Sequence, residues 1–261
     1  MQTACISDEA RAAVPPLFAR EIAVAPVSRS SPTGNRFLDA LSEPGRGGLL
    51  DLLEPAPLTP PAVLVEAGTP ARTVYFPVEG MISMVMPFSG GAAVEVATIG
   101  REGIAGLPTT LGGGGSRTRL VAQVRGRALA VPTGAFAGQV LQDSSGLRDM
   151  LLRYSAALFG QVAQVAGCNR LHGNDSRLAR WLLMIRDRVS TDSFDITHEY
   201  LAQMLGTRRE TVTVSAGALQ AAGMITYGRG RVQILDRPLL EEAACECYAA
   251  MRAEADSVFE R

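Results

Sequence analysis

Residues 195–225 constrain the fold most strongly, because they combine two helical patterns with a glycine between them. Thr197 can cap a helix start by accepting from a free backbone N–H, and Glu199 places negative charge in the first turn. Apolar residues then recur at helical spacing until Gly206, which suits the left-handed end of a helix. Thr207 can cap a second helix. The stretch therefore predicts two short helices joined by a tight turn.

The second of these helices is polar at its start and apolar along one face further on. In a helix-turn-helix, the polar start enters the major groove, where arginine can bind guanine and glutamate can accept from cytosine. A helical hairpin with a solvated charged end is the alternative. We expect four residues of this helix to read bases: Arg208, Arg209, Glu210 and Thr213.

A pair of short alternating strands follows the second helix. Residues 223–227 and 232–235 flank the turn Gly228-Arg229-Gly230-Arg231, a pattern typical of a β-hairpin. A hairpin in this place completes a winged helix, and arginines at its tip would meet phosphates. The residues expected to contact the DNA backbone are Thr197, Thr207, Thr211, Arg229 and Arg231.

The length of 261 residues and the hydrophobic content of 47% allow two domains, each with its own core. The formal net charge is -1, so a surface that binds nucleic acid has to be local. No stretch reaches the roughly 18 apolar residues that span a bilayer, and residues 1–34 lack the pattern of a signal peptide. We therefore expect a cytoplasmic protein.

The N-terminal half predicts an antiparallel β structure behind a mobile arm. Residues 1–34 are rich in Pro and Ser, which favours an arm without fixed structure. Short apolar helices are expected around 35–41 and 48–53. Valine-rich runs between Gly and Pro turns predict strands at 62–66, 73–77, 81–86, 93–99, 120–123 and 127–132. These strands suit a β-roll of the cupin-like jelly-roll kind.

A long helix is expected at 144–169, where apolar residues recur at three-four spacing beyond the part that could cover the β-roll. This excess favours pairing with the same helix of a second chain. A further helix at 175–188, with Trp181 in its core, would support the helix-turn-helix. The fold class is α+β. The predicted parts are an arm (1–34), a sensory β-roll (35–143), a dimerisation helix (144–169) and a winged helix-turn-helix domain with a C-terminal helix (170–261).

This arrangement resembles the Crp/Fnr family of bacterial transcription regulators over roughly residues 35–245. The most specific part is the run Thr207-Arg208-Arg209-Glu210-Thr211-Val212, because Arg-Glu-Thr-Val begins the recognition helix of that family. The resemblance implies a homodimer that binds an imperfect palindrome in double-stranded DNA under the control of a signal, with RNA polymerase as a further partner. Val214 replaces an arginine of the family pattern, so an altered operator is expected.

Family members that bind a cyclic nucleotide place a glutamate and an arginine around its ribose and phosphate. Arg117 and Thr118 occupy the arginine and hydroxyl positions of that pattern, whereas Ala105 stands in place of the glutamate. Glu102 could substitute for it only if the loop shifted. Two hypotheses remain: an effector pocket formed by Arg117, Thr118 and Glu102, and a β-roll that binds no nucleotide.

The cysteines Cys5, Cys168, Cys245 and Cys247 do not form the N-terminal cluster of an iron-sulfur sensor, so no such cluster is expected. Cys168 and His172 could share a helical face at the hinge, where a thiol or a metal would act on the DNA-binding domain. An ordinary buried thiol beside a polar cap is the preferred alternative. Cys245 and Cys247 are expected in a C-terminal helix, pointing apart and unable to chelate together. No metal site is therefore predicted.

Two other functions compete with a transcriptional regulator. An enzyme would need His172 and His198 as acid-base groups, but neither lies in a catalytic motif. The second competitor is a cyclic-nucleotide-binding module with a vestigial DNA-binding domain. We expect a regulator and no enzyme, with a signal that reorients the DNA-binding domains about a hinge at 169–174.

Overall fold

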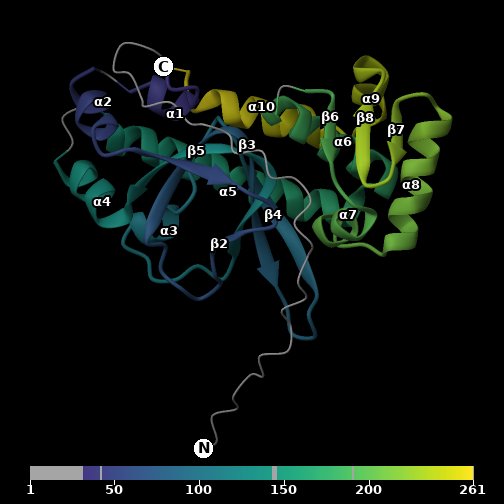
Figure 1. Cartoon of the computed structure of the whole chain (residues 1–261), viewed down its shortest axis with the longest axis horizontal. Helices are drawn as coiled ribbons and strands as arrows, with labels where there is room; N and C mark the ends of the chain where they lie inside the picture. The colour runs from purple at the N-terminus through teal and green to yellow at the C-terminus, as the bar shows by residue number, and fades with distance from the viewer. Residues whose placement is uncertain (1–31, 42, 143–145, 190, 261) are drawn as a thin grey trace, which may run out of the picture.

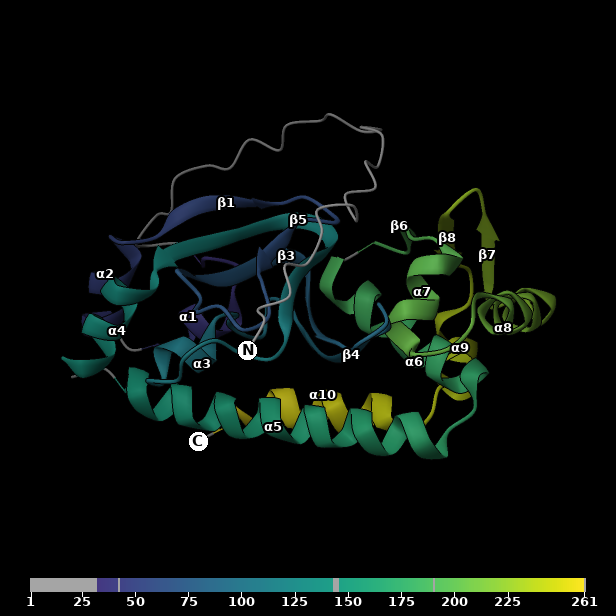
Figure 2. The ribbon, with the colours of Figure 1, turned by 90° about the horizontal axis from the view of Figure 1, so that it is seen from below.

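The computed structural model describes residues 32–41, 43–142, 146–189 and 191–260. The arm predicted at 1–34 lies outside the described residues except for its last positions. A β-roll and a smaller, mostly helical domain lie side by side, and the long helix α5 (Leu147–Leu171) runs along both of them (Figures 1 and 2). Within the described residues, none of the helices combines the length and apolar character needed to cross a membrane.

The β-roll is an antiparallel sheet with the strand order β1-β5-β3-β4, in which β2 also pairs with β5. The strand bounds are β1 (Glu54–Leu58), β2 (Val63–Val65), β3 (Thr73–Pro87), β4 (Ala93–Ile99) and β5 (Arg119–Pro132). Short helices flank the sheet: α1 (Arg36–Asp39), α2 (Glu43–Leu50), α3 (Leu107–Thr110) and α4 (Thr133–Leu141). The antiparallel roll expected from the valine-rich runs is confirmed.

The break predicted between the strands 73–77 and 81–86 is a β-bulge, so these two predicted strands form the single strand β3. The register between β3 and β5 shifts between Pro77 and Met81. Gly80 has a φ of 85°, and a Cβ there would lie 2.6 Å from the Val124 carbonyl oxygen. Only glycine fits such a close approach. Gly80 therefore bends a continuous strand instead of ending one.

Strand β5 likewise joins two predicted strands, and strand β1 was not predicted at all. The sequence of β1, Glu-Pro-Ala-Pro-Leu, contains two prolines that cannot donate to a neighbouring strand. Its position at the edge of the sheet, paired with β5, tolerates them.

The C-terminal domain contains the elements of a winged helix, as expected. Its bounds are α6 (Asn174–Val189), β6 (Ser193–Asp195), α7 (His198–Leu205), α8 (Arg209–Ala221), β7 (Ile225–Gly228), β8 (Arg231–Ile234), α9 (Arg237–Ala243) and α10 (Cys247–Ser257). The three strands form a sheet in the order β6-β8-β7. Helix α10 leaves this domain and packs along α5 (Figure 2).

One face of α5 is apolar and exposed. Leu152 and Phe159 are 58% and 75% exposed. The exposed residues on this face follow an alternating spacing of four and three: Leu152, Ala156, Phe159, Ala163 and Ala166. This is the spacing of a coiled-coil seam. The opposite face packs on the roll and on α10, so α5 has a covered side and an uncovered apolar side.

The two domains share a hydrophobic core where separate cores were expected. Met81, Val121 and Val124 of the roll belong to the same buried cluster as Trp181 of α6. The Trp181 indole N–H donates to the Glu95 carboxylate of β4 at 2.8 Å, and the Ser83 hydroxyl donates to the same group at 2.5 Å. Helix α6 is therefore packed against the sheet, and a buried acid lies at the contact.

The buried carboxyl of Glu95 makes stability depend on pH. Burial raises the pKa of Glu95 from 4.5 to about 7, although hydrogen bonds from Ser83 and Trp181 oppose the shift. The pKa of Glu95 is therefore higher in the folded protein than in the unfolded chain. The protonated carboxyl of Glu95 contributes its full stabilisation below pH 4.5, and this contribution is lost as the pH rises through about 7.

Glu95→Gln keeps the shape and the acceptor for Trp181 but cannot ionise. We expect its free energy of unfolding to equal the parent's near pH 4.5 and to exceed it above pH 7, by on the order of 3 kcal/mol. Urea unfolding over this pH range measures the difference, with the exposed Glu66→Gln as control. Parallel pH curves for parent and Glu95→Gln would contradict the assignment.

Candidate nucleic-acid interface

The first helix of the predicted helix-turn-helix begins and ends where the sequence indicated. The Thr197 hydroxyl caps α7 by accepting from the Tyr200 N–H at 3.2 Å. Gly206 ends the helix with a φ of 60° and a ψ of 39°. This left-handed conformation turns the chain sharply toward α8.

The cap predicted for the second helix is wrong by one residue. Arg208, not Thr207, is the N-cap of α8, and it makes no side-chain cap hydrogen bond. The Thr207 N–H instead donates to the Ala202 carbonyl at 2.9 Å and so closes the left-handed turn after α7. Thr207 therefore belongs to the turn, and α8 begins at Arg209.

An apolar underside fixes the orientation of α8. Its buried residues Val212, Ala216 and Leu219 pack in one cluster with Leu201 and Leu205 of α7. Helix α6 supports both helices from behind. The charged start of α8 is consequently directed away from the core, and the helix lies at the outer end of the domain (Figures 1 and 2).

The residues expected to read bases are accessible. Arg208, Arg209, Glu210 and Thr213 are all exposed. In the part of the chain that the structure describes, the three charged side chains take part in no ion pair, so their polar groups are available to a ligand. The Thr213 hydroxyl differs, because it lies 3.0 Å from His198 Nδ1 and 3.1 Å from the Arg209 carbonyl.

His198 links α7, α8 and the wing, a role that the sequence did not indicate. Its ring stacks on Tyr227 with centroids 4.2 Å apart, and its Nδ1 meets Thr213. The Tyr227 hydroxyl donates to the Ile196 carbonyl at 2.6 Å. Burial, with a contribution from the nearby Arg209 charge, lowers the pKa of His198. A neutral imidazole can therefore hold the base of the wing against the start of α8.

The wing is a two-residue hairpin. Arg229 and Gly230 both have positive φ, 52° and 77°, as the mirror-image turns between paired strands require. Arg229 therefore lies at the tip, as predicted. Arg231 lies at the start of β8, where its Nε donates to the Ser193 hydroxyl at 2.8 Å. Strand β6 thus holds one of the two wing arginines and leaves the other at the end of the hairpin.

A groove of about 1480 Å³ separates the start of α8 from the hairpin that joins β3 and β4. One wall includes the expected DNA-contacting residues Thr197, Thr207, Arg208, Arg209, Glu210 and Thr211. The other wall includes Phe88 and Val94 of the roll. A Cβ on Gly206 would come within 3.0 Å of Val94, so the two walls touch at the bottom of the groove.

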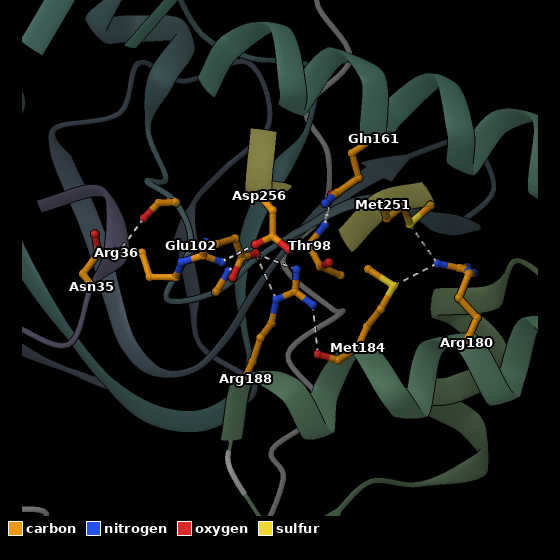
Figure 3. Close-up of polar contacts among 12 residues, drawn as sticks. Asn35, Arg36, Thr98, Glu102, Gln161, Arg180, Met184, Arg188, Met251 and Asp256 are labelled. Atoms are coloured by element: carbon orange, nitrogen blue, oxygen red, sulfur yellow. Dashed lines mark hydrogen bonds and ion pairs between the residues drawn. The ribbon is translucent and has the colours of Figure 1, made fainter. Parts of the chain in front are cut away.

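The predicted effector pocket does not form. Glu102 is directed toward α6, where it accepts from Arg188 Nη2 at 2.5 Å and Nε at 3.1 Å (Figure 3). The side chains of Glu102 and Arg188 are only 13% and 9% exposed. Arg117 is exposed, and Thr118 is buried with its hydroxyl 2.8 Å from that of Ser116. Glu102 therefore joins the roll to the C-terminal domain.

A small cavity lies near Thr118 in the described part of the roll. Its volume is about 20 Å³, and Ile99, Leu120 and other apolar residues line it together with Thr118. Small-molecule sites have volumes of about 300 Å³ or more. Ala105 is fully buried and bridges to Tyr75, so no acidic group enters from that position.

A group of thiols and one imidazole lies at the end of α5. Cys168 is in the last turns of that helix, and His172 follows its end. Cys245 lies in the connection between α9 and α10, after the extended residue Ala244, and Cys247 is the first residue of α10. The prediction that both residues of this pair lie in one helix is therefore wrong. The four potential ligand atoms lie within 4.8 Å of one another.

Comparisons with known proteins match both halves of the chain. A cyclic nucleotide-binding domain model matches residues 57–143, and a Crp-like helix-turn-helix domain model matches residues 176–243. A comparison with curated proteins finds no match.

Solved structures share the fold. FixK2 from Bradyrhizobium japonicum has a TM-score of 0.63 and 17% identity, covering 74% of this chain and 98% of its own. A CRP-family transcriptional regulator from Thermus thermophilus has a TM-score of 0.61 and 20% identity, covering 73% and 96%. Because the two domain models together match more than half of the chain, in the order in which the structure arranges the domains, the chain belongs to the Crp/Fnr family, whose members are transcriptional regulators and not enzymes.

Proposed function

We propose that this regulator binds DNA sequence-specifically as a homodimer, with the start of α8 from each copy in a major groove. The observation that carries this proposal is the exposed, charged start of α8 on a buried apolar support, with a wing beside it. Dimers of this kind place two such helices about 34 Å apart, on half-sites one helical turn apart. The target would be an imperfect palindrome.

Direct reading of bases is assigned to Arg209 and Glu210, with Arg208 beside them. Arginine can donate two hydrogen bonds to guanine, and glutamate can accept a hydrogen bond from the amino group of cytosine. Thr213 has a hydroxyl already engaged by His198, so we propose that it mainly orients the reading residues. The residues proposed to contact phosphates are Thr197, Thr207, Thr211, Arg229 and Arg231.

Val214 adds an apolar contact to this surface. It is 72% exposed and lies one turn after Glu210 on the same face of α8. A large apolar side chain in that place suits the methyl group of thymine in the major groove. We therefore propose that Val214 favours an A·T pair next to the pair read by Glu210.

Dimer formation is supported by the uncovered face of α5. Leu152, Ala156, Phe159, Ala163 and Ala166 would be buried if two copies of the helix paired in parallel. Such pairing would place the C-terminal domains of both copies on the same end of the dimer. This is the arrangement that two half-sites on one face of DNA require.

Control by a signal would act on the contacts between the domains. Helix α5 ends at Leu171 and α6 begins at Asn174, which agrees with the proposed hinge at 169–174. A signal that weakened the Glu102–Arg188 or Glu95–Trp181 contact would release α7 and α8 from the roll. The cavity of about 20 Å³ does not support a cyclic nucleotide as that signal. RNA polymerase is the proposed partner at a promoter.

Replacement of the two arginines separates base reading from backbone binding. Arg209→Ala should cost about 1–3 kcal/mol at one base position and relax specificity there. Arg229→Ala should weaken binding to all sequences and reduce the dependence of affinity on salt. Selection of duplexes from a random pool, followed by affinity measurements at several salt concentrations, tests both. The same uniform loss for both variants would contradict the assigned roles.

A charge in the exposed seam of α5 should break the dimer. Phe159→Glu would place a carboxylate between two helices, where an unpaired buried charge costs several kcal/mol, so dimerisation should weaken on the order of 100-fold or more. Sedimentation velocity measures the change. Leu141→Glu is the matched control, because Leu141 is 77% exposed but lies on α4 outside the seam. If both variants sedimented like the parent, the seam would not be the dimer interface.

A further inference from the structure

We propose that Cys168, His172, Cys245 and Cys247 bind one Zn²⁺ ion per chain. Three thiolates and one imidazole are a common ligand set of structural zinc sites, which are tetrahedral and closed to water. The thiols of Cys168, Cys245 and Cys247 are free and buried. The inference does not depend on how the protein reads DNA.

The distances between the side chains fit a tetrahedron around zinc. Zinc lies about 2.3 Å from sulfur and about 2.0–2.1 Å from nitrogen, so ligands in a tetrahedron are about 3.5–3.8 Å apart. The sulfurs of Cys168 and Cys245 are 3.6 Å apart, and Cys247 Sγ lies 3.4 Å from His172 Nδ1. A disulfide would need about 2.05 Å. Two of the distances between ligand atoms therefore match a tetrahedral zinc site, and all four atoms lie within 4.8 Å of one another.

Neighbouring groups orient the ligands. The Nε2 atom of His172 lies 3.0 Å from the Glu246 carboxylate, and this contact leaves Nδ1 directed at the thiols. A carboxylate on the outer nitrogen is the usual partner of a histidine that binds zinc. The Gln164 amide also donates to Cys247 Sγ at 3.0 Å. Such a second layer of hydrogen bonds is expected around a metal site.

The charges around the cluster also suit a dication. Three thiolates, a neutral histidine and Zn²⁺ leave one negative charge. The buried guanidinium of Arg180 lies within electrostatic range of Cys168 and Cys245 and can balance it. Soft sulfur ligands exclude Mg²⁺ and Ca²⁺, which prefer oxygen.

Bound zinc would fasten the C-terminal domain at its hinge. Cys168 and His172 are on the segment that ends α5, whereas Cys245 and Cys247 are on the segment that starts α10. These segments are 77 residues apart in sequence at the closest thiol pair. An ion between them would fix α10 to α5 at the point where the chain turns into α6.

Metal content and coordination test the proposal directly. The full chain, purified under reducing conditions and without added chelator, should contain one zinc per chain by elemental analysis and native mass spectrometry. Replacement of the ion by Co²⁺ should give the strong visible absorption of a tetrahedral thiolate site. His172→Gln should weaken zinc binding at least about tenfold and alter this spectrum, whereas Cys5→Ser should change neither. A reduced protein that takes up no zinc, or a His172→Gln variant with the parent's affinity and spectrum, would overturn the proposal.

A variant outside the ligand set tests the site without changing a buried residue. Glu246 is 76% exposed, so its loss should not disturb the core. Removal of such an outer partner weakens metal binding by about 10- to 100-fold. Competition with a chromophoric chelator should show this loss for Glu246→Ala and none for Glu242→Ala, an exposed glutamate on the neighbouring helix α9. Equal zinc affinity of both variants would show that Glu246 does not support a metal ligand and would contradict the site.

Discussion

Helix α6 and its contact with the sheet determine how the rest of the molecule is arranged. Trp181 is 1% exposed, and its only polar atom meets the carboxyl of Glu95 inside the protein. A buried polar group without a partner costs about 1–3 kcal/mol, so these two residues hold α6 in one orientation on β4. Because α7, α8, α9 and α10 all contact α6 or its neighbours, the position of the reading helix depends on this contact. Arg188 and Glu102 fix the far end of α6 in the same way (Figure 3).

The features that were predictable from sequence are those set by neighbouring residues. Thr197 and Gly206 have the conformations that a cap and a left-handed turn require, and β4 has the bounds that its alternation indicated. Strand β1 and the bulge at Gly80 were not predictable, because they depend on which strand lies alongside. Proline and glycine normally mark the end of a strand, and only a sheet edge or a close backbone contact makes them acceptable within one.

Among the residues of the candidate sites, those set by neighbouring residues were likewise predictable, and those set by distant partners were not. The charged start of α8 could be identified because polarity along one helix is a local property. The position of Glu102 could not be predicted, because its partner Arg188 is 86 residues away in the sequence. Its carboxylate is directed toward α6 and not into the interior of the roll. The cysteines are a similar case: the pair near α10 was assigned to one helix, whereas α9 is followed by an extended residue, Ala244, and Cys245 lies outside α10 with its thiol next to Cys168 of α5.

The side chains on the exposed apolar face of α5 become smaller toward the C-terminal end of the helix. Its N-terminal half presents Leu152 and Phe159, whereas its C-terminal half presents Ala163 and Ala166. The separation of packed helices, about 8–10 Å, depends on the size of the side chains between them, so two copies could approach more closely near the hinge than near the roll. The axes of two paired α5 helices would therefore converge toward the DNA-binding domains. A small sliding or tilting of one helix would then be magnified into a larger change in the distance between the two reading helices.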